Sequence, residues 1–307
     1  MRIAVIGSGG VGGYFGGRLA QAGHEVIFVA RGRHLAAMRE KGLRIESSRG
    51  DAMIPAANAT DDPASIGICD IVMFCVKLWD VDDAAQKIAP LVAKGGAVIP
   101  FQNGLYAPQA LQRIVGHDKV VGGVAYIAAT IREPGVIVHT GTMARLVVGP
   151  FDSANAGPAN AFRDACAGAG VDCDVSPDIN RALWEKFCFL SALSGTTSLA
   201  RQPLGVVRAD PDLRAAFEAA VREAWTVGRA RGVALADDVV AKALAALDSL
   251  PAEMRSSMLN DLVAGNRLEA QWLSGAVASL SRESNLAAPV SATLFAAVKP
   301  YINGAKA

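Results

Sequence analysis

The chain has 307 residues, 51% of them hydrophobic and 19% charged, which predicts one large folded domain or two ordinary ones and excludes a disordered chain. Thirty basic and 29 acidic residues leave a formal net charge of +1, so binding to nucleic acid or to a membrane surface through bulk charge is not expected. The apolar runs are shorter than the roughly 20 residues that span a bilayer, and we expect no signal peptide.

The cysteines indicate a reducing compartment. They are odd in number and form no C-x-x-C pair, and they are Cys69, Cys75, Cys166, Cys173 and Cys188. Thiols in apolar strands and helices are typical of a cytoplasmic protein, and we expect no metal site.

Short apolar strands alternate with helical stretches from residue 1 to about 175. We expect strands at 2–6, 25–30, 69–76, 96–101, 120–128 and 145–149, and a hairpin formed by 43–47 and 52–56. Such alternation is typical of βαβ units with a mostly parallel sheet. The sequence therefore predicts an α/β fold whose first domain, residues 1–176, is a doubly wound Rossmann-type unit.

The second half of the chain has long, alanine-rich amphipathic stretches. They lie at 178–194, 210–231, 236–249, 266–284 and 289–299, separated by turn signals such as Leu250-Pro251. These stretches predict an all-helical C-terminal domain over residues 177–307, which we expect to bind the substrate. Because helical second halves often dimerise, this domain is also a candidate surface for a homodimer.

A glycine-rich turn, GSGGVGG, follows the first predicted strand and begins a helix. Its glycines match G-x-G-x-x-G, a pattern that permits a tight turn and lets the backbone approach a pyrophosphate at the helix N-terminus. The alternative is a merely glycine-rich turn. The residues predicted to contact a dinucleotide are Gly7, Ser8, Gly9, Gly10, Val11 and Gly12.

An arginine follows the second predicted strand, where an NAD site commonly has a carboxylate for the ribose 2′-hydroxyl. Arg31 occupies this region, and Arg33 lies close by. A guanidinium can bind a phosphate through two hydrogen bonds, which predicts NADPH as the cofactor. The alternative is an exposed loop arginine without a ligand.

Two further polar residues are expected at the same edge of the sheet. The apolar segment DIVMFCVK ends at Lys77, and GAVIPFQNG ends in Gln102-Asn103-Gly104. Because strand carboxyl ends point at the ligand in this architecture, Lys77 could contact a phosphate or the nicotinamide ribose, and Asn103 a carboxamide or a substrate carbonyl. Ordinary loop polarity is the alternative for each.

Two charged residues fall on apolar helical stripes. At about 100° per residue, Lys186 shares a stripe with Leu183 and Leu190, and Glu269 shares one with Leu273. Either they form a buried ion pair between helices or they line the active site, with Lys186 as the proton donor and Glu269 positioning it or the substrate. Desolvation lowers the pKa of a lysine and a nearby carboxylate raises it.

As a set, these motifs resemble the ketopantoate reductase (2-dehydropantoate 2-reductase) family. The motifs are GSGGVGG, Arg31, Lys77, QNG at 102–104, LWEK at 183–186, and SSMLND at 256–261 leading to Glu269, in the family's order over nearly the whole chain. The resemblance implies a Rossmann domain followed by a helical domain. It also implies that Lys77 lies near the nicotinamide ribose and that Asn103 lies between cofactor and substrate. Ala128, on the expected strand 120–128, is expected by the same resemblance to lie beside the cofactor.

On the substrate side, the resemblance makes Lys186 the general acid and implies that Ser257 and Glu269 bind the carboxylate and hydroxyl ends of the substrate. Leu190 and Ser194 depart from the family, which has asparagines at these positions of the pocket. Ser194 stays among the predicted substrate-binding residues. These changes make the pocket less polar, so they affect the substrate's side chain rather than the reaction type.

The leading interpretation is therefore NADPH-dependent reduction of ketopantoate to (R)-pantoate in pantothenate synthesis, with Lys186 as general acid. A D-2-hydroxyacid dehydrogenase for a bulkier branched or aromatic 2-oxo acid is the enzymatic alternative. A non-catalytic dinucleotide sensor is a third, although a sensor needs no buried acid. The expected partner is a small 2-oxo acid.

Overall fold

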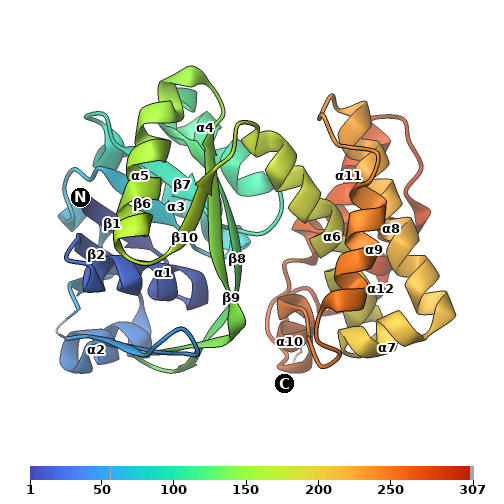
Figure 1. The fold of residues 1–307 in the computed structure, drawn as a ribbon, viewed down its shortest axis with the longest axis horizontal. Coiled ribbons are helices and arrows are strands. Elements are labelled where there is room, and N and C mark those ends of the chain that lie inside the picture. Colours follow the sequence, from blue (N-terminus) through green and yellow to red (C-terminus); the bar gives the residue numbers. More distant parts are fainter. Residues whose placement is uncertain (56, 305–307) are drawn as a thin grey trace. The chain divides into compact units, whose positions relative to one another are not determined.

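The structure, a computed structural model, describes residues 1–55 and 57–304, and these residues form two compact units (Figure 1). The first unit comprises Met1–Gln102 and Tyr106–Ile179. The second comprises Asn103–Leu105 and Asn180–Ala307. The short segment Asn103–Leu105 thus belongs to the second unit, although it lies between two segments of the first.

A five-stranded parallel sheet forms the centre of the first unit. Its order is β5-β2-β1-β6-β7, and the strands are β1 (Arg2–Ile6), β2 (Glu25–Val29), β5 (Ala59–Thr60), β6 (Ile71–Phe74) and β7 (Ala97–Pro100). Because Ile6 lies beside both Val29 and Phe74, the carboxyl ends of the central strands meet at one edge. This is the edge at which such sheets bind ligands.

Helices follow most of these strands, as the alternation predicts. They are α1 (Gly10–Gln21), α2 (Gly32–Lys41), α3 (Val81–Ile88) and α4 (Tyr106–Val115). A fifth helix, α5 (Ala156–Gly168), comes later in the unit, and short 3₁₀ turns lie between these elements: η1 (Pro63–Ser65), η2 (Leu78–Asp80), η3 (Ala89–Val92), η4 (His117–Lys119) and η5 (Ser153–Asn155). Strands β6 and β7 are buried along their whole length, which explains their unbroken apolar sequences.

A second, mixed sheet corrects the expectation of βαβ units up to residue 175. Its path is β10-β9-β3-β4, and β8 pairs with β9; the strands are β3 (Leu43–Ser47), β4 (Ala52–Ile54), β8 (Val121–Glu133), β9 (Val136–Pro150) and β10 (Asp172–Val175). β8 and β9 form a long antiparallel ribbon, whereas the sequence predicts only its apolar ends, 120–128 and 145–149. Between these ends, residues 130–134 and 140–143 are exposed, and the only apolar run is the short segment Val136–Val138.

The predicted hairpin is confirmed, because β3 and β4 pair antiparallel. It belongs to the second sheet, since β3 also pairs in parallel with β9. Residue 56, at the end of the predicted range 52–56, lies outside the described residues.

The second unit is helical, and together with the parallel sheet it confirms the predicted fold class. Its helices are α6 (Ile179–Ala200), α7 (Leu204–Ala209), α8 (Pro211–Ala230), α9 (Val239–Ser249), α10 (Ser257–Val263), α11 (Ser274–Glu283) and α12 (Pro289–Val298), with 3₁₀ turns η6 (Ala270–Trp272) and η7 (Lys299–Tyr301). Within residues 1–55 and 57–304, no helix is both long and apolar enough to cross a membrane.

The helix expected at 266–284 is wrong in its first half. Residues 266–269 are not helical, η6 follows, and the backbone of Leu273 (φ −112°, ψ −105°) separates η6 from α11. Leu268, Ala270 and Leu273 are buried in one cluster with Met258 and Val298. Burial of these side chains in a tertiary cluster thus accounts for the apolar spacing that suggested a continuous helix.

Candidate functional site

The glycine turn closes tightly between β1 and α1. Gly7 has φ +95°, and a Cβ there would lie 2.8 Å from the backbone carbonyl carbon of Cys75. A Cβ on Gly12 would lie 2.3 Å from the carbonyl oxygen of Gly7. Both positions therefore require glycine, and the turn leads into the N-terminus of α1, where backbone N–H groups favour an anion.

The turn forms hydrogen bonds to β2 and lies close against the backbone of β8. The backbone nitrogen of Ser8 and its Oγ lie 3.1 Å and 3.0 Å from the carbonyl oxygen of Val29. A Cβ on Gly10 would lie 1.9 Å from the carbonyl oxygen of Ala129. Ala128, the exposed neighbour of Ala129, lies at a register shift of β8. The structure thus brings the β8 segment containing Ala128 to the glycine turn.

Arg31 lies just beyond the carboxyl end of β2. It occupies the N-cap position of α2, with extended backbone (φ −134°, ψ 159°). Its side chain is exposed, as is that of Arg33. The two cations therefore lie at the edge of the sheet that also carries the glycine turn.

Lys77 lies just beyond the carboxyl end of β6, at the N-cap position of η2. Its Nζ is 5.5 Å from the centre of the Trp79 ring, within the range of a cation–π contact. Nearby, Nε2 of Gln102 donates to the carbonyl oxygen of Val76 at 3.0 Å. This bond joins the chain that follows β7 to the chain that follows β6.

In the second unit, Lys186 and Asn103 meet directly. Nζ of Lys186 donates to Oδ1 of Asn103 at 2.9 Å, across 83 residues of sequence. Lys186 lies in the second turn of α6 and is half-buried. Burial lowers its pKa to about 8, because desolvation disfavours the charged form. The sequence predicts both residues, and of the two opposing effects it predicts on this pKa, desolvation is the one that acts.

Leu190, one turn after Lys186, is part of an apolar wall. It packs against the cluster that includes Met258, Leu268 and Leu273. Ser194 is fully buried, and its Oγ has no hydrogen-bond partner among the described residues. Beyond Lys186, therefore, this side of α6 offers apolar contacts and a buried hydroxyl.

Ser257 and Glu269 lie at the ends of short elements. Ser257 is exposed and is the first residue of α10, and Glu269 is half-buried at the N-cap position of η6. The expected helical stripe through Glu269 and Leu273 is wrong, because both residues precede α11, which begins at Ser274.

Sequence reasoning missed the residues that anchor α10. Oγ of Ser256 accepts from the backbone nitrogen of Leu259 at 3.0 Å. The same Oγ lies 2.8 Å from Oγ1 of Thr197, and that hydroxyl donates to the carbonyl oxygen of Leu193 at 2.6 Å. Each hydroxyl then donates one hydrogen bond and accepts one if Ser256 donates to Thr197. Serine before an apolar segment is an N-cap signal, but nothing local identifies Thr197 as its partner.

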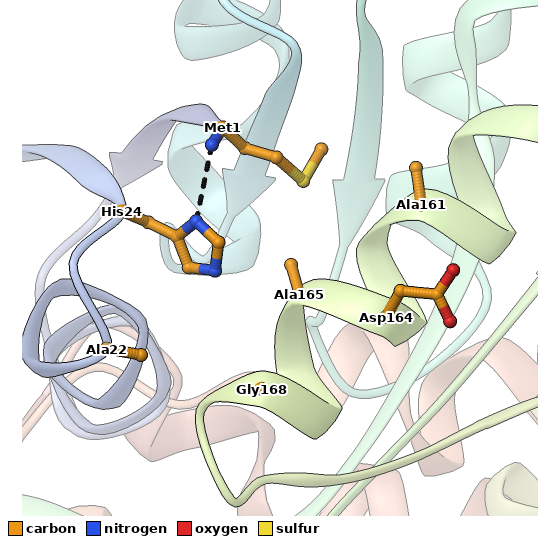
Figure 2. Close-up of a pocket in the computed structure, with 7 residues that line it drawn as sticks. All are labelled: Met1, Ala22, His24, Ala161, Asp164, Ala165 and Gly168. Atoms are coloured by element: carbon orange, nitrogen blue, oxygen red, sulfur yellow. Dashed lines mark hydrogen bonds between the residues drawn. The ribbon is translucent and has the colours of Figure 1, made fainter.

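A cavity of about 480 Å³ lies at a different edge of the first unit (Figure 2). Met1 precedes β1 and His24 precedes β2, and the amino group of Met1 lies 3.2 Å from Nδ1 of His24. The cavity is therefore at the amino ends of the parallel strands. Ligands of such sheets bind at the carboxyl ends, so this cavity is not the candidate site.

Comparison with known proteins gives matches along almost the whole chain. The family model described as "Ketopantoate reductase PanE/ApbA" matches residues 3–153, and "Ketopantoate reductase PanE/ApbA C terminal" matches residues 178–302. An uncharacterized oxidoreductase, YkpB, of Bacillus subtilis is 29% identical over 98% of this chain and 99% of its own length. A 2-dehydropantoate 2-reductase of Halobacterium salinarum is 32% identical over 96% of each chain.

Solved structures agree with these matches. A PanE/ApbA family ketopantoate reductase from Ralstonia eutropha JMP134 has a TM-score of 0.90 and 31% identity, covering 98% of each chain. A D-mandelate dehydrogenase solved with NADH and anilino(oxo)acetate has a TM-score of 0.90 over 98% of each chain, but only 19% identity. The second comparison therefore concerns the fold alone.

Proposed function

Because the chain belongs to the ketopantoate reductase PanE/ApbA family of oxidoreductases, we propose that it reduces 2-dehydropantoate (ketopantoate) to (R)-pantoate with NADPH, a step of pantothenate and coenzyme A synthesis. The observation that carries this proposal is the contact between Lys186 and Asn103. An ammonium held by an amide oxygen, with a pKa of about 8, can donate a proton near neutral pH.

We assign the dinucleotide to residues 1–176 and the 2-oxo acid to residues 177–307. The glycine turn supports the first assignment, because a Cβ on Gly9 would meet nothing within 4 Å and the first turn of α1 has no acidic residue. A pyrophosphate could therefore approach the backbone N–H groups there without repulsion. Lys77, Asn103 and Ala128 are proposed to complete the cofactor site.

The preference for NADPH rests on the cations beyond β2. Arg31 and Arg33 are exposed at the carboxyl end of this strand, and a guanidinium binds a phosphate better than a hydroxyl. A carboxylate, which would repel a 2′-phosphate, is absent from the segment Ala30–Arg33. These residues favour a 2′-phosphorylated cofactor.

The reduced nicotinamide, when bound, supplies a hydride to the keto carbon. Lys186 then donates a proton from Nζ to the carbonyl oxygen as negative charge develops on it. Asn103 fixes the direction of Nζ through its Oδ1. After donation, Lys186 is a neutral amine, the form that burial favours. Ser257 and Glu269 are proposed to bind the carboxylate and hydroxyl ends of the substrate.

One observation favours a second candidate substrate. Leu190 packs with an apolar cluster one turn after Lys186, where an amide side chain could have bound the hydroxyl group of ketopantoate. An apolar surface gains more from a branched or aromatic hydrocarbon side chain. The alternative is therefore the same reaction on a branched or aromatic 2-oxo acid that lacks this hydroxyl.

The test is NADPH oxidation with ketopantoate and with a panel of branched and aromatic 2-oxo acids, each repeated with NADH. We expect turnover with NADPH, and the ratio of kcat/KM values decides between the two substrates. Lys186→Met is the matched control for the chemical step. If the purified protein oxidises neither cofactor with any 2-oxo acid, the proposal is refuted.

A further inference from the structure

His34 connects the glycine turn to two other elements of the first unit. It lies in the first turn of α2 and is half-buried. Its Nε2 lies 2.9 Å from the carbonyl oxygen of Ser8, and its Nδ1 lies 3.0 Å from the backbone nitrogen of Gly135, between β8 and β9. Both partners are main-chain groups, so neither hydrogen bond depends on the position of a second side chain.

The two partners determine the protonation of the ring. The N–H of Gly135 is a donor, so Nδ1 must accept and carry no proton. The carbonyl of Ser8 is an acceptor, so Nε2 must carry the proton. Both bonds exist together only in the neutral ring with hydrogen on Nε2. Burial lowers the pKa of His34, although the bond to Ser8 opposes this effect.

The bond to Ser8 also orients the next N–H group. The carbonyl of Ser8 and the N–H of Gly9 belong to one planar trans peptide and point in opposite directions. Holding the carbonyl against His34 therefore directs the N–H of Gly9, at the N-cap position of α1, away from the ring. A Cβ on Gly9 would meet nothing within 4 Å, so space for a ligand adjoins this group.

We propose that His34 is a positioning residue of the dinucleotide site: its neutral ring holds the Ser8–Gly9 peptide in the orientation that binds the pyrophosphate. The same ring fixes the first turn of α2, whose N-cap residue is Arg31. This inference rests on the proposed function, because it requires a nicotinamide dinucleotide on the glycine turn.

The charged groups around the ring are cationic at the start of α2 and paired beside Gly135. Arg31 lies at the N-cap position of α2 and Arg33 in its first turn, and Arg39, Glu40 and Lys41 lie in its last turns. The glycine turn has no titratable side chain. Near Gly135, Arg132 and Glu133 lie on the β8–β9 ribbon, and Arg44 and Glu46 lie on β3. The backbone nitrogen of Arg44 donates to the carbonyl oxygen of Gly135 at 2.9 Å.

These ribbon and β3 groups form ion pairs with one another. Arg44 pairs with Glu46 at 3.0 Å and with Glu133 at 3.6 Å, and Arg132 pairs with the same two carboxylates. The carboxylates near Gly135 are thus paired with arginines rather than with the ring.

Protonation of His34 would add a hydrogen to Nδ1, facing the N–H of Gly135. That bond would be lost, and two donors would face each other. Because the pKa of His34 is lowered from its ordinary 6.5, the ring stays neutral at neutral pH. Dinucleotide affinity should therefore be constant above about pH 6.5 and should fall below it.

The experiment measures the dissociation constants of NADP⁺ and NAD⁺ by calorimetry for the wild type and three variants. His34→Leu removes both hydrogen bonds, whereas His34→Gln keeps an amide donor for Ser8 and cannot titrate. Arg31→Ala is the comparison that should affect only the 2′-phosphate. His24→Gln, a half-buried histidine at the amino ends of the strands, is the matched control, and each variant's melting temperature is measured without ligand.

We expect His34→Leu to raise both dissociation constants about tenfold, whereas Arg31→Ala raises only that of NADP⁺. On acidification to about pH 5.5, the wild type should lose more affinity for NADP⁺ than His34→Gln does; the titrating 2′-phosphate is common to both. Equal affinities and parallel pH profiles in wild type, His34→Leu and His34→Gln would overturn the inference. A wild type that binds neither dinucleotide would instead refute the proposed function.

Discussion

Replacing Lys186 with methionine should make the protein more stable and far less active. Methionine has a similar shape without the charge, so it fills the half-buried position in the second turn of α6. The proton donor is lost, and kcat should fall about 10²–10⁴-fold. NADPH affinity should change little, because the glycine turn and Arg31 belong to the other unit.

The stability gain follows from the pKa. Burial lowers the pKa of Lys186 from 10.5 to about 8, and each tenfold change in proton affinity corresponds to about 1.4 kcal/mol, so charging this group at pH 7 costs the fold at most about 3 kcal/mol. Partial exposure reduces this cost. Methionine also removes the bond to Asn103, which stabilises by about 1–2 kcal/mol. The free energy of unfolding should therefore rise by about 1 kcal/mol.

The stability advantage of Lys186→Met over the wild type should shrink as the pH rises. The pKa is lower in the folded than in the unfolded chain, so the unfolded wild type binds more protons between pH 8 and 10.5. The wild type thus gains stability relative to Lys186→Met as the pH rises through this window. Catalysis should move the opposite way, with kcat/KM falling above about pH 8 as the donor loses its proton.

Urea unfolding and steady-state NADPH oxidation, each measured across this pH range, check both parts. Comparison with the variant removes contributions from other titrating groups. Truncating one partner of a buried ion pair costs about 3–5 kcal/mol. If Lys186→Met is destabilised by that amount and keeps its turnover number, Lys186 is structural and the catalytic assignment is wrong.

Three further substitutions test the cofactor and substrate sites. Arg31→Ala should raise KM for NADPH about tenfold through loss of a charge-assisted bond, with NADH kinetics little changed; efficient use of NADH by the wild type would contradict this. Leu190→Asn should shift the ratio of kcat/KM values toward ketopantoate, and a wild type strictly selective for ketopantoate and unaffected by the change would show that the hydroxyl is recognised elsewhere. Gly10→Ala should destabilise the fold by about 1–3 kcal/mol, because its Cβ would lie 1.9 Å from the carbonyl oxygen of Ala129. In the matched variant Gly9→Ala the new Cβ would meet nothing within 4 Å, so this variant should unfold like the wild type. Equal urea midpoints for the two variants would contradict the geometry.

Local chemistry in the sequence determined the parts of this protein that depend on near neighbours. The glycine turn needs only its own residues and the strand and helix on either side, so its motif predicts it directly. The parallel strands β6 and β7 are buried on both faces and read as continuous apolar runs. Lys186 stood out because a charge on an apolar stripe requires a special environment.

Only the tertiary structure decided where segments distant in sequence meet. The amide that holds Lys186 comes from Asn103, 83 residues away, and no local pattern encodes such a contact. In the outer half of the β8–β9 ribbon, exposed residues at 130–134 and 140–143 surround one short apolar run, Val136–Val138, so pairing with the partner strand rather than composition makes it a strand. The backbone of Leu273 interrupts the helix that its spacing suggests, and α11 begins only at Ser274, because burying the Leu273 side chain with Met258 and Val298 outweighs a weak local preference for helix.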